Sequence, residues 1–595
     1  MTDSGESNRT TETAHLARGW VATGVFLVVL VTYVLSSPGR IDVFDGQARY
    51  EVAYNWLLAG RPIIREPVTR FLMGFRGRHN LTYSHYGAGG SLFAIPLVWM
   101  GTWNDDPPGE TSRFLFSLAC CVFGALTCAV LCLFYLELDI SLPRALAWTF
   151  VTAFTTMLWP ASTTTFDNAQ HAFFVIGSLY LGFLSAKRQS RLLAATGGFV
   201  AGILLLYQEY FLLILPALAI STLSWSHAGI MADSQDPMQG KQHPRKSLAC
   251  QLRQGARAVG AVIRSACQQA GQTRESCLRF LLFLTSTSVG AILYLGYNNL
   301  RFGSFFQNGN LAYAAKYHYP TFGNPIAGFL TLLASPGKSV FLYSPPIILG
   351  LWGFRCLWRR KPELGAAILA TSTVLVLFIS CITFAGGDWC WGPRYMAALL
   401  PLWALAFPFV SLRGRLRRNL VLALLAAGLV VQGLGLSVEN QRFFFERALK
   451  DFFWADDSWY YFKHSALFAR VGEVASLAHG LPPEARPFNP MTYPALSTFT
   501  IFGPPPNVPR RLTPEWMRQF KVFYLPKPWP IWMWTIKPEL RAINLEACLG
   551  ALFGIALLGI ALIFHGFQIV ANHRAPQEIF GEKELARPEA LTIGK

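Results

Sequence analysis

Two aspartates stand at the ends of apolar segments, where a carboxylate could accept a proton. Asp45 lies just after the first apolar segment, before a stretch whose apolar and aromatic residues repeat at helical spacing. Asp167 lies between two later apolar segments, in WPASTTTFDNAQHA (159–172). A carboxylate within hydrogen-bond reach of a nucleophile can serve as its general base. Both positions are also typical of a helix N-cap, so a structural role stays open beside the catalytic one.

Positively charged side chains in or beside the predicted outer loops are candidates for binding a phosphate. Lys338 opens a predicted membrane span, Arg394 follows two tryptophans, and Arg49 lies in the helical stretch of the first loop. Arginine grips phosphate through paired N–H donors, whereas lysine acts as a point charge. Two plainer roles stay open for Arg394, namely pairing with Asp388 or extension to the membrane surface.

The first loop carries a series of arginines, which are Arg49, Arg61, Arg65, Arg70, Arg76 and Arg78. They make its surface attractive to anionic headgroups or to a phosphate-bearing substrate. They do not decide the orientation of the chain, because the positive-inside rule governs short loops rather than long ones.

Polar and aromatic side chains near these charges are candidates for contacting a substrate. Tyr83, His85 and Tyr86 lie in a glycine-rich stretch that allows a tight backbone path, and Asp388 and Glu209 are acidic candidates in other loops. For the aromatic residues the alternative is a belt at the membrane interface.

The composition places these residues in a membrane protein. Hydrophobic residues make up 52% of the 595 and charged residues only 14%, whereas a soluble domain carries about a quarter charged residues. The net charge of +18 is concentrated in short gaps between apolar runs, where orientation signals belong. No zinc-finger or basic-helix pattern accompanies it, so nucleic acid is excluded as a partner.

The cysteines and acids indicate no cofactor. The eleven cysteines show no CxxC or metal-type spacing, so neither a disulfide framework nor a zinc site is expected. A divalent metal stays open, although no dense cluster of acids or histidines indicates one.

The elements that must position these residues are expected to be helices that cross the bilayer. Many apolar runs approach the ~20 residues needed to span a hydrocarbon core of about 30 Å. We therefore expect an all-α polytopic fold with about twelve spans. The spans are expected near 19–36, 113–136, 144–159, 169–186, 191–206, 210–225, 280–299, 338–357, 364–384, 393–411, 419–437 and 543–566. The weakest division is that between 191–206 and 210–225, which also fits one broken element around Tyr207–Tyr210.

Short basic gaps set the expected orientation. The gaps beginning at Lys187, Arg355 and Arg413 and the basic loop 226–279 fall on one side, which the positive-inside rule makes cytoplasmic. The segments expected outside are 37–112, 160–168, 300–337, 385–392 and 438–541. The apolar run 89–101 is too short to cross and is predicted to be an interfacial helix on the outer leaflet.

The expected organisation is that of one multi-pass protein of the cell or inner membrane. A cytoplasmic tail precedes the transmembrane module, and an outer segment of mixed structure precedes the last span and a second cytoplasmic tail. The boundaries are 1–18, 19–437, 438–541, 542–566 and 567–595. The first outer loop, 37–112, contains the interfacial helices.

The pattern resembles the glycosyltransferase-C superfamily, and within it the protein-mannosyltransferase and aminoarabinose-transferase branch. The resemblance is carried by FDGQARYEVAYNWLLAG (44–60), YSHYGAGGSLFAIPLVWMG (83–101), SPGKSVFLYSP (335–345) and GGDWCWGPRY (386–395). It covers most of residues 19–437 in layout. Where some relatives carry two adjacent acids in the first loop, Gly46 follows Asp45 here.

The resemblance implies an enzyme of the cell envelope that transfers a hexose or pentose from a polyprenyl-phosphate carrier with inversion. The acceptor would be a lipid, glycan or protein outside the cytoplasm, on the periplasmic or exterior face of the membrane. By position Asp45 would be the general base, and Asp167 would be the second outer acid. Lys338 and Arg394 would stabilise the departing phosphate, with Arg49 as a further choice.

Two other functions stay open. A transporter or lipid flippase would use charged residues at broken helices, and Gln208–Glu209 is the feature that favours it. A ligase or polymerase of lipid-linked polysaccharides would share the outer acids and the phosphate grip. A scaffold or receptor role for 438–541 also stays open.

Overall fold

The structure is a computed structural model that describes most of the chain. The described residues are 3–66, 69–70, 73–104, 109–223, 274–317, 320–387, 389–438, 440, 443–444, 458–479 and 544–585. The basic loop expected at 226–279 therefore lies outside the described residues up to residue 273, as does most of the outer segment 438–541.

Within these ranges, seven helices are long and apolar enough to cross a membrane. They are Leu16–Ser36 in α1 (Asp3–Ser36), Glu110–Glu137 across α6 (Glu110–Ser117) and α7 (Ala119–Glu137), α10 (Asn168–Lys187), α14 (Arg274–Phe302), α19 (Pro362–Cys381), α21 (Arg415–Ser437) and Leu545–Val570 in α28 (Leu545–Leu585). They fall where seven of the expected spans were placed, and the chain is a membrane protein. The total of about twelve spans stays a prediction.

Three of the other expected spans are broken by proline. Helix α8 (Leu142–Thr155) stops before Thr156, and α9 (Leu158–Ser162) follows it. Pro160 explains the break, since a proline ring collides with the carbonyl four residues earlier. In the same way Pro345 and Pro346 separate α17 (Val340–Tyr343) from α18 (Ile347–Arg360). The third broken span consists of η7 (Arg394–Leu399), α20 (Leu400–Ala404) and η8 (Phe407–Phe409).

The segment after α10 is a pair of shorter helical pieces with an extended residue between them. The first piece is α11 (Arg191–Ile203) with η2 (Leu204–Leu206), and the second is η3 (Glu209–Ile214), α12 (Leu215–Ala219) and η4 (Ile220–Thr222). Gln208 has φ −148° and ψ 132°, which is extended backbone, so the helix is interrupted there. This is the break that the polar residues of Tyr207–Tyr210 indicated.

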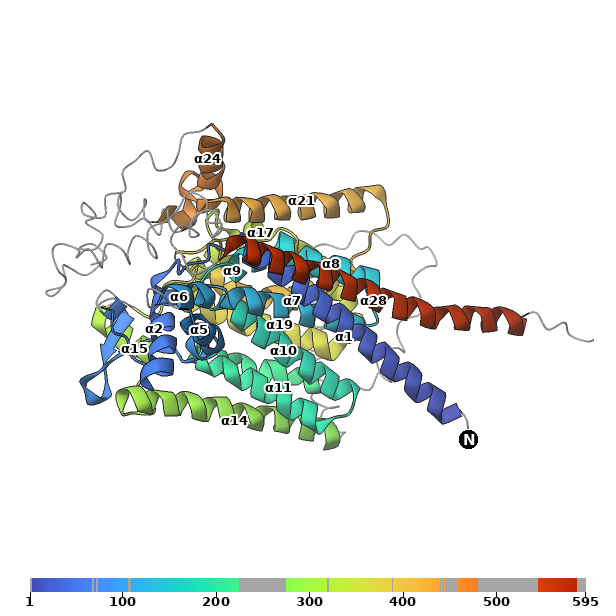
Figure 1. Cartoon of the computed structure of the whole chain (residues 1–595), viewed down its shortest axis with the longest axis horizontal. Helices are drawn as coiled ribbons and strands as arrows, with labels where there is room; N and C mark the ends of the chain where they lie inside the picture. The colour runs from blue at the N-terminus through green and yellow to red at the C-terminus, as the bar shows by residue number, and fades with distance from the viewer. Residues whose placement is uncertain are drawn as a thin grey trace, which may run out of the picture.

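Glycines let the long helices approach closely. Figure 1 shows α1 beside α28, and a side chain at Gly24 would collide with the backbone of Gly559. A side chain at Gly290 of α14 would likewise collide with the backbone of Gly202 in α11. Small residues at helix crossings are how membrane helices gain packing, because lipid gives them no hydrophobic drive to associate.

The chain after α1 forms a small layer at one end of the bundle (Figure 1). It contains α2 (Phe44–Ala59), followed by an antiparallel hairpin of β1 (Gly74–Arg76) and β2 (Thr82–Ser84) in which Phe75 pairs with Tyr83. The hairpin is a departure from the predicted all-α fold. The other described elements whose bounds have not yet been given are η1 (Arg78–Asn80), α4 (Gly89–Leu92), α5 (Ile95–Thr102), α15 (Gly309–Tyr317), α16 (Pro325–Ala334), η9 (Phe462–His464) and α24 (Ala466–Ala478).

The short apolar run expected as an interfacial helix is α4 and α5. Helix α5 has eight residues, a length of about 12 Å that cannot cross a bilayer. Trp99 is 49% exposed, Met100 48% and Trp103 68%, while Val98 packs inward. A short helix with one tryptophan-rich exposed face suits the membrane surface.

The opposite end of the bundle gathers ion pairs around Glu137. Its carboxylate oxygens lie 2.9 Å from Arg18, 2.8 Å from Lys187 and 3.2 Å from Arg188. The ends of α1, α7 and α10 therefore meet there, away from the layer that holds α2.

Candidate active site

Three separate parts of the chain meet at the start of α2. Asp45 lies in the first turn of α2, in which Val43 occupies the N-cap position. Its Oδ2 lies 3.5 Å from Nη1 of Arg394, and both side chains are 17% exposed. The Arg394 guanidinium also lies 3.9 Å from the ring centre of Phe166, the residue before Asp167. The predicted base and one predicted phosphate ligand are thus in contact.

One turn further along α2, Arg49 forms a buried ion pair with the second predicted acid. Arg49 Nη2 lies 2.9 Å from Asp167 Oδ2, and the side chains are 4% and 9% exposed. His171, one turn into α10, approaches the same oxygen at 3.6 Å. Asp167 occupies the N-cap position of α10 but makes no cap hydrogen bond there, so its carboxylate serves Arg49 instead.

The charges of this cluster act on one another. Burial alone would raise the pKa of the Asp167 carboxyl, but the charges of Arg49 and His171 outweigh burial and hold the pKa well below its usual range. Burial would lower the pKa of the Arg49 guanidinium, but Asp167 and Asp45 together raise it. Acidic and basic side chains therefore alternate in this cluster, as Asp167, Arg49, Asp45 and Arg394.

Both arginines retain an unused donor. Arg49 Nη1 and Arg394 Nε are buried and have no hydrogen-bond partner among the described residues. Buried polar atoms are nearly always satisfied, so two such donors in one cluster are unusual. They suit an anionic oxygen of a ligand, which arginine binds through charge-assisted hydrogen bonds.

The backbone around the cluster leaves room for the two long side chains. A side chain at Gly90 would approach Cδ of Arg49 to 2.8 Å, and one at Gly387 would approach Cγ of Arg394 to 2.6 Å. Gly387 also has φ +64°, a conformation that glycine adopts without strain.

Asp42 holds the loop before α10 against the start of α2. Its carboxylate accepts hydrogen bonds from the Thr164 hydroxyl at 2.6 Å and from the Thr165 backbone N–H at 2.9 Å. These bonds hold the residues immediately before Asp167 against the start of α2. Asp42 and His171 were not predicted. The available signals were a second acid three residues before Asp45 and the four-residue spacing from Asp167 to His171 on one helix.

Lys338 lies beneath the loop that carries Arg394 and is 2% exposed. Its ammonium donates to the backbone oxygens of Gly387 at 2.6 Å, Cys390 at 3.1 Å and Gly392 at 3.1 Å. An ammonium group has three N–H donors, and three carbonyl groups occupy them here. The structure therefore places Lys338 where it holds the 387–392 backbone.

The described part of the outer segment reaches the same place. The Trp459 carbonyl accepts a hydrogen bond from Gly337 N at 3.0 Å, and the Ser465 hydroxyl donates to the Pro336 carbonyl at 2.9 Å. Residues near the start of 438–541 thus support the loop around Lys338.

The predicted substrate-binding residues are distributed over different places. The Tyr86 ring lies under the Arg49 guanidinium, 4.3 Å from it, and the His85 ring packs on Tyr86 with ring centres 3.8 Å apart. Burial lowers the pKa of His85 to about 4. Tyr83 in β2 forms a backbone bridge to Ile63 and is 3% exposed, and its ring lies 6.3 Å from that of Phe302 at the end of α14.

Of the two remaining candidates, the structure places only Glu209, away from the cluster. Glu209 follows the break in the helix, and its Oε1 accepts a hydrogen bond from the Asn310 amide at 3.0 Å. Asp388 lies outside the described residues. Among the described residues no three His, Cys, Asp or Glu side chains are grouped as a metal site.

The chain matches no model of a known protein family and no curated protein. It resembles two solved structures of the oligosaccharyltransferase of Archaeoglobus fulgidus. The form tethered through a disulfide bond with an acceptor peptide containing the NVT sequon gives a TM-score of 0.37 at 13% identity, and the apo form gives 0.34 at 14%. Both matches cover 73% of this chain and 55% of the archaeal chain, so this chain spans about half the length of those structures. At these low TM-scores the likeness assigns neither a family nor an activity.

Proposed function

We propose that the chain is a membrane glycosyltransferase that moves a sugar from a polyprenyl-phosphate carrier to an acceptor hydroxyl or amine outside the cytoplasm. The observation that carries the proposal is the contact of Asp45 with Arg394 beside the Arg49–Asp167 pair, where each arginine has a buried N–H group without a hydrogen-bond partner among the described residues. A carboxylate for the incoming nucleophile and cations for a departing phosphate are the two groups that this reaction requires.

The reaction is a single displacement. The acceptor oxygen or nitrogen forms a bond to the anomeric carbon of the sugar while its proton passes to the Asp45 carboxylate. The bond between the anomeric carbon and the phosphate oxygen breaks, and its electron pair leaves with polyprenyl phosphate. One displacement from the opposite face inverts the anomeric centre. Phosphate is a competent leaving group, so cationic stabilisation replaces a dedicated acid.

In this proposal each of the surrounding residues has a separate role in binding or positioning. Arg49 Nη1 and Arg394 Nε would bind the phosphate oxygens, and Tyr86 would line the wall next to Arg49. Asp167 would hold Arg49 in place as a positioning residue, since its Oδ2 contacts Arg49 in the absence of substrate. Lys338 would act through the backbone of 387–392, not by touching the phosphate.

The proposal is tested with the purified full chain in lipid vesicles and a panel of radiolabelled polyprenyl-phosphate hexoses and pentoses. We expect label to move from the carrier to an acceptor in a membrane lipid extract, with release of polyprenyl phosphate. Arg394→Gln should weaken donor binding strongly, and Arg413→Gln, at an exposed arginine just before α21, is the matched control. Transfer that Arg394→Gln leaves unchanged would contradict the proposed phosphate grip.

The donor distinguishes this reaction from that of a polysaccharide ligase. A transferase accepts a single sugar on one phosphate, whereas a ligase requires a pyrophosphate-linked oligosaccharide. Activity with the second donor alone would replace the proposal by the ligase.

Transport is the second candidate, and the extended residue Gln208 between two helical pieces favours it. Transporters place binding groups at such breaks, and Glu209 lies there. Loss of substrate movement across vesicles in Glu209→Gln, with Asp45→Asn fully active, would favour transport over transfer.

A further inference from the structure

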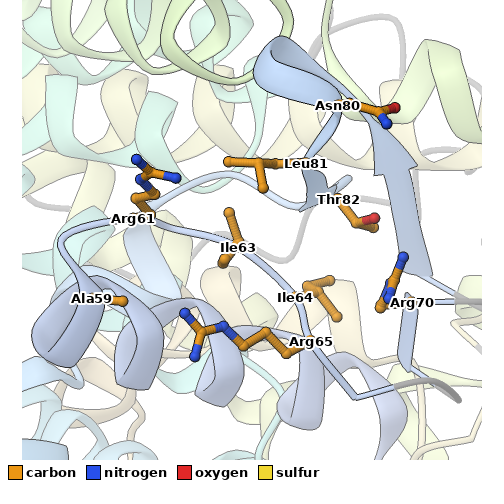
Figure 2. A pocket seen from close by; sticks show the side chains of 9 residues that line it. All are labelled: Ala59, Arg61, Ile63, Ile64, Arg65, Arg70, Asn80, Leu81 and Thr82. Carbon is orange, nitrogen blue, oxygen red and sulfur yellow. The ribbon is translucent and has the colours of Figure 1, made fainter.

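The far end of α2 carries a basic cavity that the proposed transfer reaction does not use. The cavity has a volume of about 470 Å³, and Arg61, Arg65 and Arg70 stand around it (Figure 2). Ile63, Ile64 and Leu81 lie between the three guanidiniums, and Asn80 and Thr82 add polar atoms at the hairpin side. We call this cavity the hairpin pocket.

The backbone that presents these arginines is held firmly. Gly60 ends α2 in the left-handed conformation, with φ +65°. Glu51 then accepts the backbone N–H groups of Arg65 at 2.8 Å and Glu66 at 2.9 Å. Ile64 donates its N–H to the Thr82 carbonyl at 2.9 Å, which ties the segment to β2.

The positive charge of the hairpin pocket is not neutralised by the acids nearest to it in the chain. Glu51 is engaged by the two backbone N–H groups, and Glu66 pairs with Arg113. Within the described ranges, no ion pair or side-chain hydrogen bond involves the guanidiniums of Arg61, Arg65 or Arg70. Three like charges around one cavity repel one another, so an anion bound among them would be stabilised.

A second cavity of about 620 Å³ shares Arg61 and Leu81 with the hairpin pocket and extends to α14. Arg78 stands on its hairpin side, and Gly296, Asn299 and Leu300 form its wall on α14. This face of α14 continues as an exposed apolar surface, on which Ile292 is 66%, Leu293 50% and Leu300 46% exposed. Basic cavities thus stand directly above a helix face suited to lipid chains.

This place is distinct from the site around Asp45. Asp45 and Ala59 are fourteen positions apart on α2, a rise of about 21 Å at 1.5 Å per residue. In a polyprenyl-phosphate sugar the phosphate is attached to the carbon that is transferred. A phosphate in the hairpin pocket therefore belongs to a different molecule from the donor.

We propose that the hairpin pocket binds the phosphate headgroup of an anionic membrane lipid, whose acyl chains lie along the exposed face of α14. The cluster of arginines supplies the charge complement of the headgroup, and the apolar face of α14 supplies the surface for the chains. Such a lipid would tie the first outer loop to the edge of the bundle. The proposal does not depend on the activity assigned to Asp45.

The test uses the full chain in vesicles that contain a photoactivatable phosphatidylglycerol, with cross-links mapped by mass spectrometry. We expect labelling of α14 near Gly296–Leu300, reduced at high salt. The triple variant Arg61→Gln, Arg65→Gln, Arg70→Gln should lose this labelling by on the order of 100-fold, since each arginine near an anionic headgroup contributes several-fold in affinity.

The control is the triple variant Arg413→Gln, Arg415→Gln, Arg417→Gln, which removes the same charge from the exposed start of α21 and the residues just before it. It should keep the labelling of α14. Both triple variants should elute and melt like the parent chain, because surface substitutions without contacts change stability little.

Two results would overturn the proposal. Equal labelling of α14 in the parent chain and in the Arg61, Arg65, Arg70 variant would show that the arginines do not hold the lipid. Displacement of the lipid by glycerol phosphate at equal concentration would show that the pocket takes phosphate alone, without help from the acyl chains. Labelling of the parent chain by the phosphatidylglycerol probe but not by a phosphatidylcholine probe would support selection by charge.

Discussion

Replacing Asp167 by asparagine would leave the Arg49 guanidinium in the interior without its counterion. The two groups lie 2.9 Å apart with side chains 4% and 9% exposed, and the neighbouring Asp45 already faces Arg394. Removing one partner of such a buried pair costs about 3–5 kcal/mol, because the remaining charge is desolvated and uncompensated. Asparagine keeps the shape of the side chain, so the loss reports the charge.

The measurement is the Tm of the purified full chain in detergent. We expect Asp167→Asn to melt several degrees lower, and the double variant Arg49→Gln, Asp167→Asn to recover much of the loss, since neither charge is then left alone. The matched control is Glu275→Gln. Its partner Arg191 lies 2.6 Å away, but their side chains are 57% and 52% exposed, so solvent screens the pair and no measurable loss is expected.

The pH dependence adds a second criterion. The folded pKa of Asp167 lies below its unfolded value, so the pair contributes stability above the unfolded pKa of about 3.9 and loses it as pH falls through the folded pKa. The Tm difference between parent and Asp167→Asn should therefore stay constant from neutral pH down to about pH 5. An Asp167→Asn chain that melts like Glu275→Gln, or a double variant no more stable than the single, would refute the reasoning.

Two other changes have definite expected outcomes. Lys338→Met removes the ammonium that holds the Gly387 backbone, so it should lower the Tm and raise the KM for the donor. The exposed control Lys463→Met should change neither quantity. An unchanged KM in Lys338→Met would argue against a positioning role. Burial and the charge of Glu66 raise the pKa of Glu51 to about 8. Between about pH 5 and pH 8 the folded state therefore holds a proton that the unfolded state has released. The free energy of unfolding should fall as pH rises through this range. Glu51→Gln should flatten that fall in Tm, and an identical pH profile for the variant would contradict the raised pKa.

Much of the helical layout could be predicted because length and hydropathy determine which segments can cross a bilayer. The ends of α10 and α19 fall within a few residues of the expected spans for that reason. Breaks are harder to place. The polar residues of Tyr207–Tyr210 indicated the break between α11 and η3. The break between α8 and α9 was not predicted, because Pro160 acts on the carbonyl four residues earlier, within a continuous apolar run near 144–159.

The residue types of the candidate site could be named from the sequence, whereas their pairings could not. Asp45 and Arg394 are 349 positions apart, and only the packing of α2 against the 387–395 loop brings them together. The N-cap alternative for Asp167 was reasonable from its position alone. Asp167 does occupy the N-cap position of α10, but its carboxylate makes no cap hydrogen bond because it pairs with the buried Arg49 charge instead.

The most direct test of the central claim is sugar transfer by Asp45→Asn in vesicles supplied with radiolabelled polyprenyl-phosphate sugar. Asparagine keeps the size of the side chain but cannot take the proton. The account predicts that transfer falls by on the order of 10²–10⁴-fold while donor binding is retained. The exposed control Asp139→Asn, at φ +60° where asparagine is tolerated, should stay fully active. Undiminished transfer by Asp45→Asn would contradict the account.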